Sequence, residues 1–202
     1  MIKFPDYSKA TNAAYETLIE YKEFSFPIGI FHLFRNLNNV RLYTYDQLMA
    51  RFGISSENFF SSSDYGYNIC DPVKRRYIVA YNSKKDETTV RFTLAHELGH
   101  VILGHTEDGD KQNKEANCFA RNLLCPIPAV EGFKVMTPDD YQQIFYVSEP
   151  MADVAKRLAC NDRYYITPKN YSNYNDHVIC NIYGISMAEL YGLPKEYNEL
   201  FA

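Results

Sequence analysis

The sequence predicts an α+β fold in which a small β-sheet packs on two consecutive helices, with additional helices before and after them. Two observations predict this fold. The short apolar run Tyr77–Tyr81 is typical of a buried strand. Two stretches with apolar residues at helical spacing follow it, one ending at Gly104 and one running from Lys111 to Leu124. We expect residues 1–202 to form a single compact domain.

Residues 1–60 are expected to supply supporting elements, mainly helices. Their apolar residues recur at helical spacing in three places, and one short segment alternates as a strand does. The predicted elements are helices at 7–21, 28–37 and 46–52 and a strand at 40–44. The segment Ser55–Tyr67 is rich in Ser, Asn and Asp and is predicted to be a loop.

The region 66–160 is expected to hold the functional core. After the Tyr77–Tyr81 strand, residues 82–86 are typical of a turn. Gly99 lies inside the helix that follows, where glycine costs about 1 kcal/mol relative to alanine. We therefore expect a packing or functional need for a position without a side chain. The apolar stripe of this helix consists of Leu94, Leu98, Val101 and Ile102.

The stretch His96-Glu97-Leu98-Gly99-His100 carries the clearest chemistry in the chain. Residues i and i+4 of an α-helix lie on one face, so both imidazoles can reach one metal ion at about 2.0–2.1 Å. Glu97 is rotated by about 100° from His96 and can accept a proton from water rather than bind the metal. The motif predicts a hydrolase zinc site with His96 and His100 as ligands and Glu97 as general base.

A zinc hydrolase needs a third protein ligand and one open position. Glu115 is the favoured candidate, because it lies at the margin of the apolar face of the 111–124 helix, from which a carboxylate can point inward. His105 does not fit the longer HExxHxxGxxH pattern, because Leu103 and Thr106 stand at its Gly and His positions. Weaker alternatives in a Gly-containing loop are Glu107, Asp108 and Asp110.

Two short helices are predicted after this region, at 138–146 and 149–159. They resemble a helix-turn-helix in outline, but few Lys or Arg side chains face outward, which argues against DNA contact there. Residues 161–202 are dense in Tyr and Asn. We expect them to form an appendage of the same domain, with a last helix at 186–191.

Composition argues against several classes of partner. The net charge of −4 disfavours a direct nucleic-acid partner, because phosphate binding depends on Lys and Arg. The chain has no run of about twenty apolar residues and no signal-peptide pattern at its start, so we expect a cytoplasmic protein without a membrane partner. The five cysteines include no C-x-x-C pair and are expected to be free thiols.

A basic cluster, Lys74-Arg75-Arg76, precedes the Tyr77–Tyr81 strand. Such a cluster forms either a solvated strand end or a cationic entry to a substrate groove. Peptidases bind extended substrates along a sheet edge, so we expect substrate backbone to pair with residues 76–82.

The blocks Arg91–His105 and Glu115–Pro126 resemble the ImmA/IrrE metallopeptidases, and so do the segments Phe145–Ser148 and Ala155–Leu158. The resemblance covers residues 77–158, with a weaker likeness at 63–67. It implies a zincin-like minimal metallopeptidase core, with zinc held by His96, His100 and Glu115 and with Glu97 as catalytic base. It also implies a protein substrate, a helix-turn-helix repressor whose cleavage derepresses mobile-element, phage or stress genes.

Two departures from the family pattern bear on the substrate. Cys125 stands where a larger apolar residue is common, and the chain beyond Leu158 matches no part of the family. The alternative function is a non-catalytic, zinc-containing regulatory or sensor protein that binds a repressor. The hydrogen-bond donor to the reacting carbonyl is left open between His105 and Tyr81, since the chain has 18 tyrosines.

Overall fold

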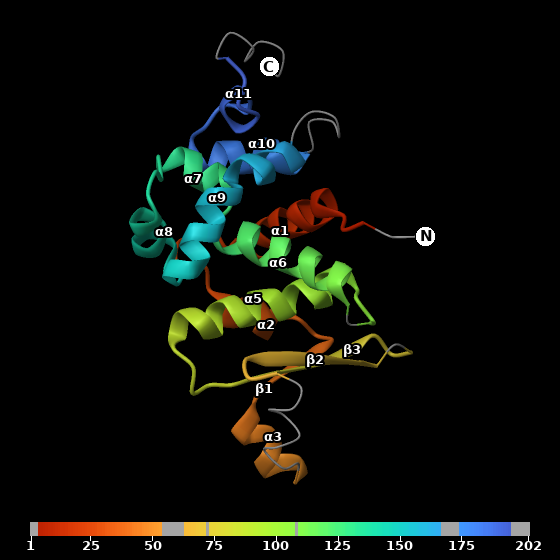
Figure 1. Ribbon diagram of the computed structural model, residues 1–202. Helices are drawn as coiled ribbons and strands as arrows, with labels where there is room; N and C mark the ends of the chain where they lie inside the picture. Colours follow the sequence, from red (N-terminus) through yellow and green to blue (C-terminus); the bar gives the residue numbers. More distant parts are fainter. Residues whose placement is uncertain (1–3, 54–62, 72, 108, 167–173, 195–202) are drawn as a thin grey trace.

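The computed structural model describes residues 4–53, 63–71, 73–107, 109–166 and 174–194 (Figure 1). Within these ranges the predicted α+β class is confirmed. In chain order the elements are α1 (Tyr7–Tyr21), α2 (Ile30–Asn36), β1 (Val40–Thr44), α3 (Tyr45–Phe52), β2 (Gly66–Asp71), β3 (Arg76–Tyr81), α5 (Glu87–Leu103), α6 (Asp110–Leu124), α7 (Ile127–Gly132), α8 (Pro138–Phe145), α9 (Glu149–Tyr165), α10 (Tyr174–Tyr183) and α11 (Met187–Leu190).

The three strands form a mixed sheet in the order β1-β3-β2. β1 runs parallel to β3, with Val40 opposite Tyr77, and β2 runs antiparallel to β3, with Gly66 opposite Tyr81. Both edges of β3 are therefore already paired. The expected pairing of a substrate with residues 76–82 is wrong, and the edge strand that contacts α5 is β2.

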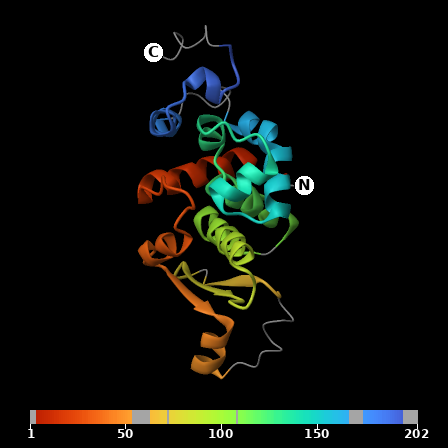
Figure 2. The same cartoon turned by 90° about the vertical axis from the view of Figure 1, so that its left-hand side faces the viewer.

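The helices stack on one side of this sheet in successive layers. α5 lies between the sheet and α6, and α1 packs on the other side of α6 (Figure 1). Figure 2 shows the same order from the side, with α3 projecting from the sheet away from the other helices. The interfaces are filled by fully buried side chains, among them Leu18 of α1, Leu94 and Leu98 of α5, and Phe119 and Leu123 of α6.

Several elements differ from the sequence-based expectation. The loop predicted to run to Tyr67 ends earlier, because β2 begins at Gly66; residues 55–62 of that loop lie outside the described part of the chain. The side chains of β2 are mostly half-buried or exposed, so apolar patterning does not mark it, and the strand is held by its ladder with β3. α9 continues to Tyr165, beyond its predicted end at Ala159.

Two further helices have no counterpart in the prediction, α7 and α10. Pro126 and Pro128 follow the end of α6, which proline cannot continue. They also start the next one, because Pro128 stands in the first turn of α7, where proline is well tolerated. α10 has a weak pattern of its own and packs through the buried residues Ile179 and Cys180.

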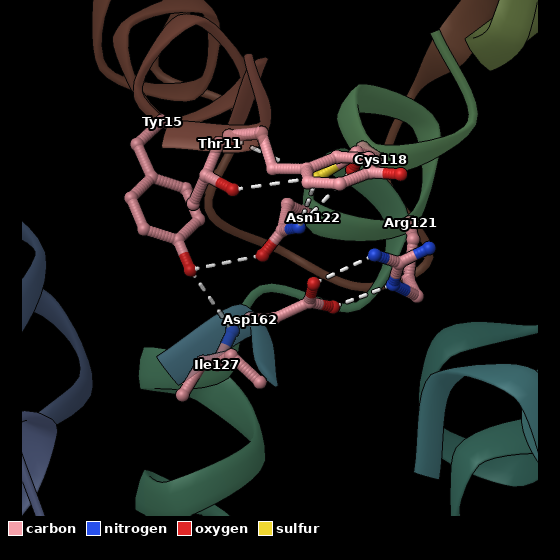
Figure 3. Close-up of polar contacts among 8 residues, drawn as sticks. Thr11, Tyr15, Cys118, Arg121, Asn122, Ile127 and Asp162 are labelled. Carbon is pink, nitrogen blue, oxygen red and sulfur yellow. Dashed lines mark hydrogen bonds and ion pairs between the residues drawn. The ribbon is translucent and has the colours of Figure 1, made fainter. Parts of the chain in front are cut away.

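Buried polar contacts join α6 to α1 and to α9 (Figure 3). The guanidinium of Arg121 donates two hydrogen bonds to the carboxylate of Asp162, at 2.5 and 2.6 Å. The Tyr15 hydroxyl donates to Asn122 Oδ1 and accepts from the Ile127 amide, both at 3.3 Å. These bonds fix α6, which carries residues of the site, against its two neighbouring helices.

None of the helices in the described ranges combines the length and the apolar character needed to cross a bilayer. All five cysteines are described, and each is a free thiol.

Candidate active site

The histidine motif lies on α5, which has a clear start and a clear end. The Asp86 side chain caps the first turn by accepting a hydrogen bond from the Thr89 amide at 2.8 Å. Gly104 ends the helix in the left-handed conformation, with φ of 71°. Between these ends the helix is buried on most of its surface, because the sheet covers one side and α6 the other.

Gly99 lies where α5 packs closely against α6. A Cβ at this position would lie 3.0 Å from Phe119 Cδ1 and 3.1 Å from the Ala116 Cα atom. The absence of a side chain at Gly99 therefore allows α5 and α6 to pack closely. This is the packing need expected from the sequence. This close approach brings α6 residues within reach of His96 and His100.

The two imidazoles of the motif face one another. Nε2 of His96 and Nε2 of His100 are 3.1 Å apart. Two nitrogen ligands of a tetrahedral zinc ion, each at about 2.0–2.1 Å, would be roughly 3.3–3.4 Å apart. The observed separation therefore fits two ligands of one metal ion.

The opposite nitrogen of each imidazole is held by another side chain. Nδ1 of His96 lies 2.9 Å from Asn117 Oδ1 on α6. Nδ1 of His100 lies 3.1 Å from Nδ1 of His105, whose Nε2 lies 3.0 Å from Oε2 of Glu115. Hydrogen bonds of this kind to the outer nitrogen orient metal-binding histidines and set their tautomer.

These partners determine which nitrogens carry lone pairs. An amide or carboxylate oxygen can only accept, so Nδ1 of His96 and Nε2 of His105 carry protons. A neutral His105 then accepts at Nδ1 from His100, which leaves the lone pair of His100 on Nε2. Two lone pairs thus face each other at 3.1 Å, an arrangement that repels unless a cation lies between them. The donor set fits a metal ion.

Glu115 is buried, as predicted, but the structure does not place it beside the two Nε2 atoms. Its Oε2 contacts His105, while its Oε1 accepts from the Asp6 amide at 2.7 Å and lies 3.4 Å from the Lys111 ammonium. Within the described ranges, no three His, Cys, Asp or Glu side chains form a group that could hold a metal. The structure thus brings His96 and His100 together, and the role of Glu115 as third ligand stays a prediction.

None of the weaker alternatives to Glu115 forms a metal-binding group with the imidazole pair within the described residues. Asp110 is exposed and forms an ion pair with Lys114 at 2.6 Å. Glu107 lines the pocket described below but is exposed, and Asp108 is outside the described residues. Asn113 lines the same pocket one helical turn before Asn117, on the same face of α6.

Glu97, the predicted general base, is buried against the sheet. Asn68 of β2 donates a hydrogen bond from Nδ2 to Glu97 Oε2 at 2.6 Å. β2 can come this close because of Gly66, where a Cβ would lie 2.6 Å from Thr93 Cγ2 of α5. Sequence reasoning did not find Asn68 or Asn117; the only signal for Asn117 is its place one turn from the other polar pocket residues of α6.

Burial and hydrogen bonding shift the pKa values of His105 and Glu115. Burial lowers the pKa of His105, which outweighs the opposing effect of Glu115. Burial alone would raise the pKa of Glu115, but the Asp6 amide, His105 and Lys111 together hold that pKa below its usual value. His105 is therefore neutral and Glu115 ionised at neutral pH, as the tautomer argument requires.

A cavity of about 940 Å³ opens onto the imidazole pair and Glu97. Its walls come from β2, α5, α6 and α9. Four tyrosines contribute to it, namely Tyr7, Tyr65, Tyr67 and Tyr165. The sequence left His105 and Tyr81 open as the hydrogen-bond donor to the reacting carbonyl. Both ring nitrogens of His105 contact other side chains. The ring of Tyr81 packs on Phe31, with ring centroids 6.1 Å apart.

Residues 60–154 match the family model described as the IrrE N-terminal-like domain of the M78 peptidases. The chain carries an ImmA/IrrE family domain. No curated protein matches the chain. The ImmA/IrrE domain includes β2, β3, α5 and α6, and so the histidine motif, Asn68, His105, Glu115 and Asn117, whereas Asp6, Tyr7 and Tyr165 lie outside it. α1, α10 and α11 lie outside the matched range, although α1 packs directly on α6.

Proposed function

We propose that this protein is a zinc-dependent endopeptidase with a zincin-like core. The observation that carries the proposal is the pair of imidazole Nε2 atoms converging at 3.1 Å beside a buried glutamate at the wall of a large cavity. The match of residues 60–154 to a peptidase family model supports the same proposal. When bound, zinc would supply the Lewis acidity that activates water and polarises a carbonyl.

The residues of the chain divide the remaining work. His96 and His100 would hold the metal, and Glu97 would take a proton from water and deliver it to the leaving amine. Asn68 holds Glu97 through Oε2. Glu115 is the sequence-based candidate for the third ligand, but its carboxylate contacts His105 and the Asp6 amide and would have to leave both to reach the metal.

We further propose that the substrate binds in extended form along β2. This strand is an edge of the sheet within the described residues, and Gly66, Tyr67, Asn68 and Cys70 all line the cavity. An edge strand offers unpaired backbone groups to a peptide. The substrate class we propose, a helix-turn-helix repressor in the cytoplasm, rests on the family resemblance.

Replacement of Glu97 tests the peptidase proposal. Purified protein would be incubated with zinc and the repressor encoded beside its gene. We expect Glu97→Gln to lower the cleavage rate by about 10²–10⁴-fold, the usual contribution of a general base, while zinc content stays equal to wild type. Equal cleavage by the variant would contradict the assignment of Glu97.

The same assay separates the alternative function. A non-catalytic zinc-containing regulator would bind the repressor and leave it intact in the wild-type protein. Co-purification of the intact repressor with zinc-loaded wild type, without fragments, would favour that alternative over the peptidase.

A further inference from the structure

The contacts that start from Nδ1 of His100 point to a role for Glu115 that differs from metal binding. Three side chains form a continuous chain: His100 Nδ1 lies 3.1 Å from His105 Nδ1, and His105 Nε2 lies 3.0 Å from Glu115 Oε2. Both ends of the chain are anchored, since His100 projects from α5 and Glu115 from α6.

All three members are shielded from water to a large degree. His100 and Glu115 are each 6% exposed, and the side chain of His105 is 10% exposed. Hydrogen bonds that are shielded in this way hold a fixed geometry, because water does not compete for the donors and acceptors. The other carboxylate oxygen of Glu115 is held by the Asp6 amide and lies near Lys111, so the carboxylate itself is fixed on both sides.

We propose that Glu115 is a positioning residue that acts through His105 to keep the Nε2 lone pair of His100 facing His96. This inference rests on the proposed metal site but not on peptidase activity. The carboxylate fixes the proton of His105 on Nε2, His105 accepts the Nδ1 proton of His100, and the lone pair of His100 is left on the side of His96. Asn117 fixes the tautomer of His96 directly, because its Oδ1 accepts the Nδ1 proton of that imidazole.

The two possible roles of Glu115 make different predictions for a double-mutant cycle. A residue that acts through His105 has no effect left once His105 is gone. A residue that binds the metal directly contributes independently of His105. Zinc dissociation constants would be measured by competition with a chromophoric chelator for wild type, His105→Ala, Glu115→Ala and the double variant.

We expect each single substitution to weaken zinc binding by about 10–100-fold, the usual effect of losing an outer-sphere partner. We expect the double variant to bind no more weakly than the weaker single variant. Multiplying effects in the double variant would overturn the inference and return Glu115 to the metal. Lys84→Ala is the control, because it removes an exposed ion pair with Asp46 that involves no residue of the site, and it should bind zinc as wild type does.

Conservative variants keep the test valid if the alanine variants lose their fold. His105→Gln retains an acceptor for His100 and a donor for Glu115, so we expect it to recover most of the zinc affinity that His105→Ala loses. Failure of this rescue, with an intact circular dichroism spectrum, would count against the inference.

Nitrogen-15 spectra of the imidazoles in the zinc-loaded protein give a readout that a general packing role would not move. We expect His105 in the Nε2–H form and His96 and His100 in the Nδ1–H form. Another tautomer at His105 would overturn the chain of contacts. Absence of zinc binding by wild type would overturn both this inference and the proposed function, whereas zinc binding without hydrolysis would affect the proposed function alone.

Discussion

Asn68, Asn117 and His105 are the residues that turn a histidine motif into an organised site. Each contacts one motif residue at hydrogen-bond distance, and each comes from a different element or from the end of α5. The HExxH spacing alone predicted His96, Glu97 and His100, because two side chains four residues apart must share a helix face. It could not predict the outer partners, because their proximity depends on how β2 and α6 pack against α5.

Glu115 shows the limit of reasoning from a helical wheel. Its place at the margin of the apolar face correctly predicted that it is buried. The wheel could not say whether the carboxylate faces the Nε2 atoms of the motif or contacts His105, since its position also depends on the Asp6 amide, which is distant in sequence.

The contact between Asn68 and Glu97 predicts a defect in turnover. Asn68→Ala removes the Nδ2 donor and leaves Glu97 without its 2.6 Å partner. We expect kcat to fall by about tenfold, about 1.4 kcal/mol, with unchanged zinc content, measured by steady-state cleavage of the repressor. Asn39→Ala, at the far end of the sheet, is the control. A loss of zinc in Asn68→Ala would show that the residue supports the metal rather than the base.

A substitution on the cavity-facing side of α6 is predicted to raise the affinity for zinc. Asn113 lines the cavity together with His96 and His100. Asn113→Glu would place a carboxylate on that side, one turn from Asn117, and so complete a set of two histidines and one glutamate. We expect zinc to bind about tenfold more tightly, measured by chelator competition. Gln112→Glu, at a position of α6 outside the cavity lining, serves as control; equal affinity in both variants would show that position 113 does not reach the metal.

At the scale of elements, some helices and strands could be predicted from the sequence and others could not. β1 and β3, and the helices α1, α5, α6 and α8, lie close to their predicted bounds because apolar periodicity marks them. β2 was missed because an edge strand with one polar side owes its conformation to the neighbouring strand rather than to its own pattern. This miss mattered for function, since β2 carries Asn68 and borders the cavity.

The bond between α6 and α9 predicts a large change in stability. Arg121 and Asp162 are 8% and 1% exposed and form a bidentate pair. Asp162→Ala would leave a buried guanidinium without its partner, which costs about 3–5 kcal/mol. Urea denaturation followed by circular dichroism would measure the loss. The double variant Arg121→Met, Asp162→Leu should recover most of it, and a double variant as unstable as the single one would contradict this account.

At the scale of the whole molecule, the core extends well beyond the family domain. The buried cluster includes Ala10, Ala14 and Leu18 of α1, each 0% exposed, together with residues of α5, α6, α9 and α10. The sequence predicted that the N-terminal part is helical and supports the core. In the structure α1 packs directly on α6. Pattern within α1 could not reveal its partner, because any apolar helix face offers the same signal.

Packing of the core also predicts how the cysteines react. Burial raises the pKa of the Cys118 thiol to about 11 and raises that of Cys125 as well, whereas Cys160 is exposed. Because the thiolate is the reactive form, we expect Cys160 to react with a disulfide reagent at pH 8 within minutes and Cys118, Cys125 and Cys180 only after unfolding. Titration with and without urea checks this. Fast reaction of the buried thiols in native protein would contradict the packing described.

The hydrogen bond from the Asp6 amide to Glu115 ties the segment before α1 to the proposed metal site across 109 positions of sequence. Changes at residue 6 would therefore act on the carboxylate of Glu115, and preparations intended for metal or kinetic assays should leave this segment unaltered. Because the donor is a backbone amide, chimaeras that exchange α1 need to preserve the backbone position of residue 6 rather than its aspartate side chain.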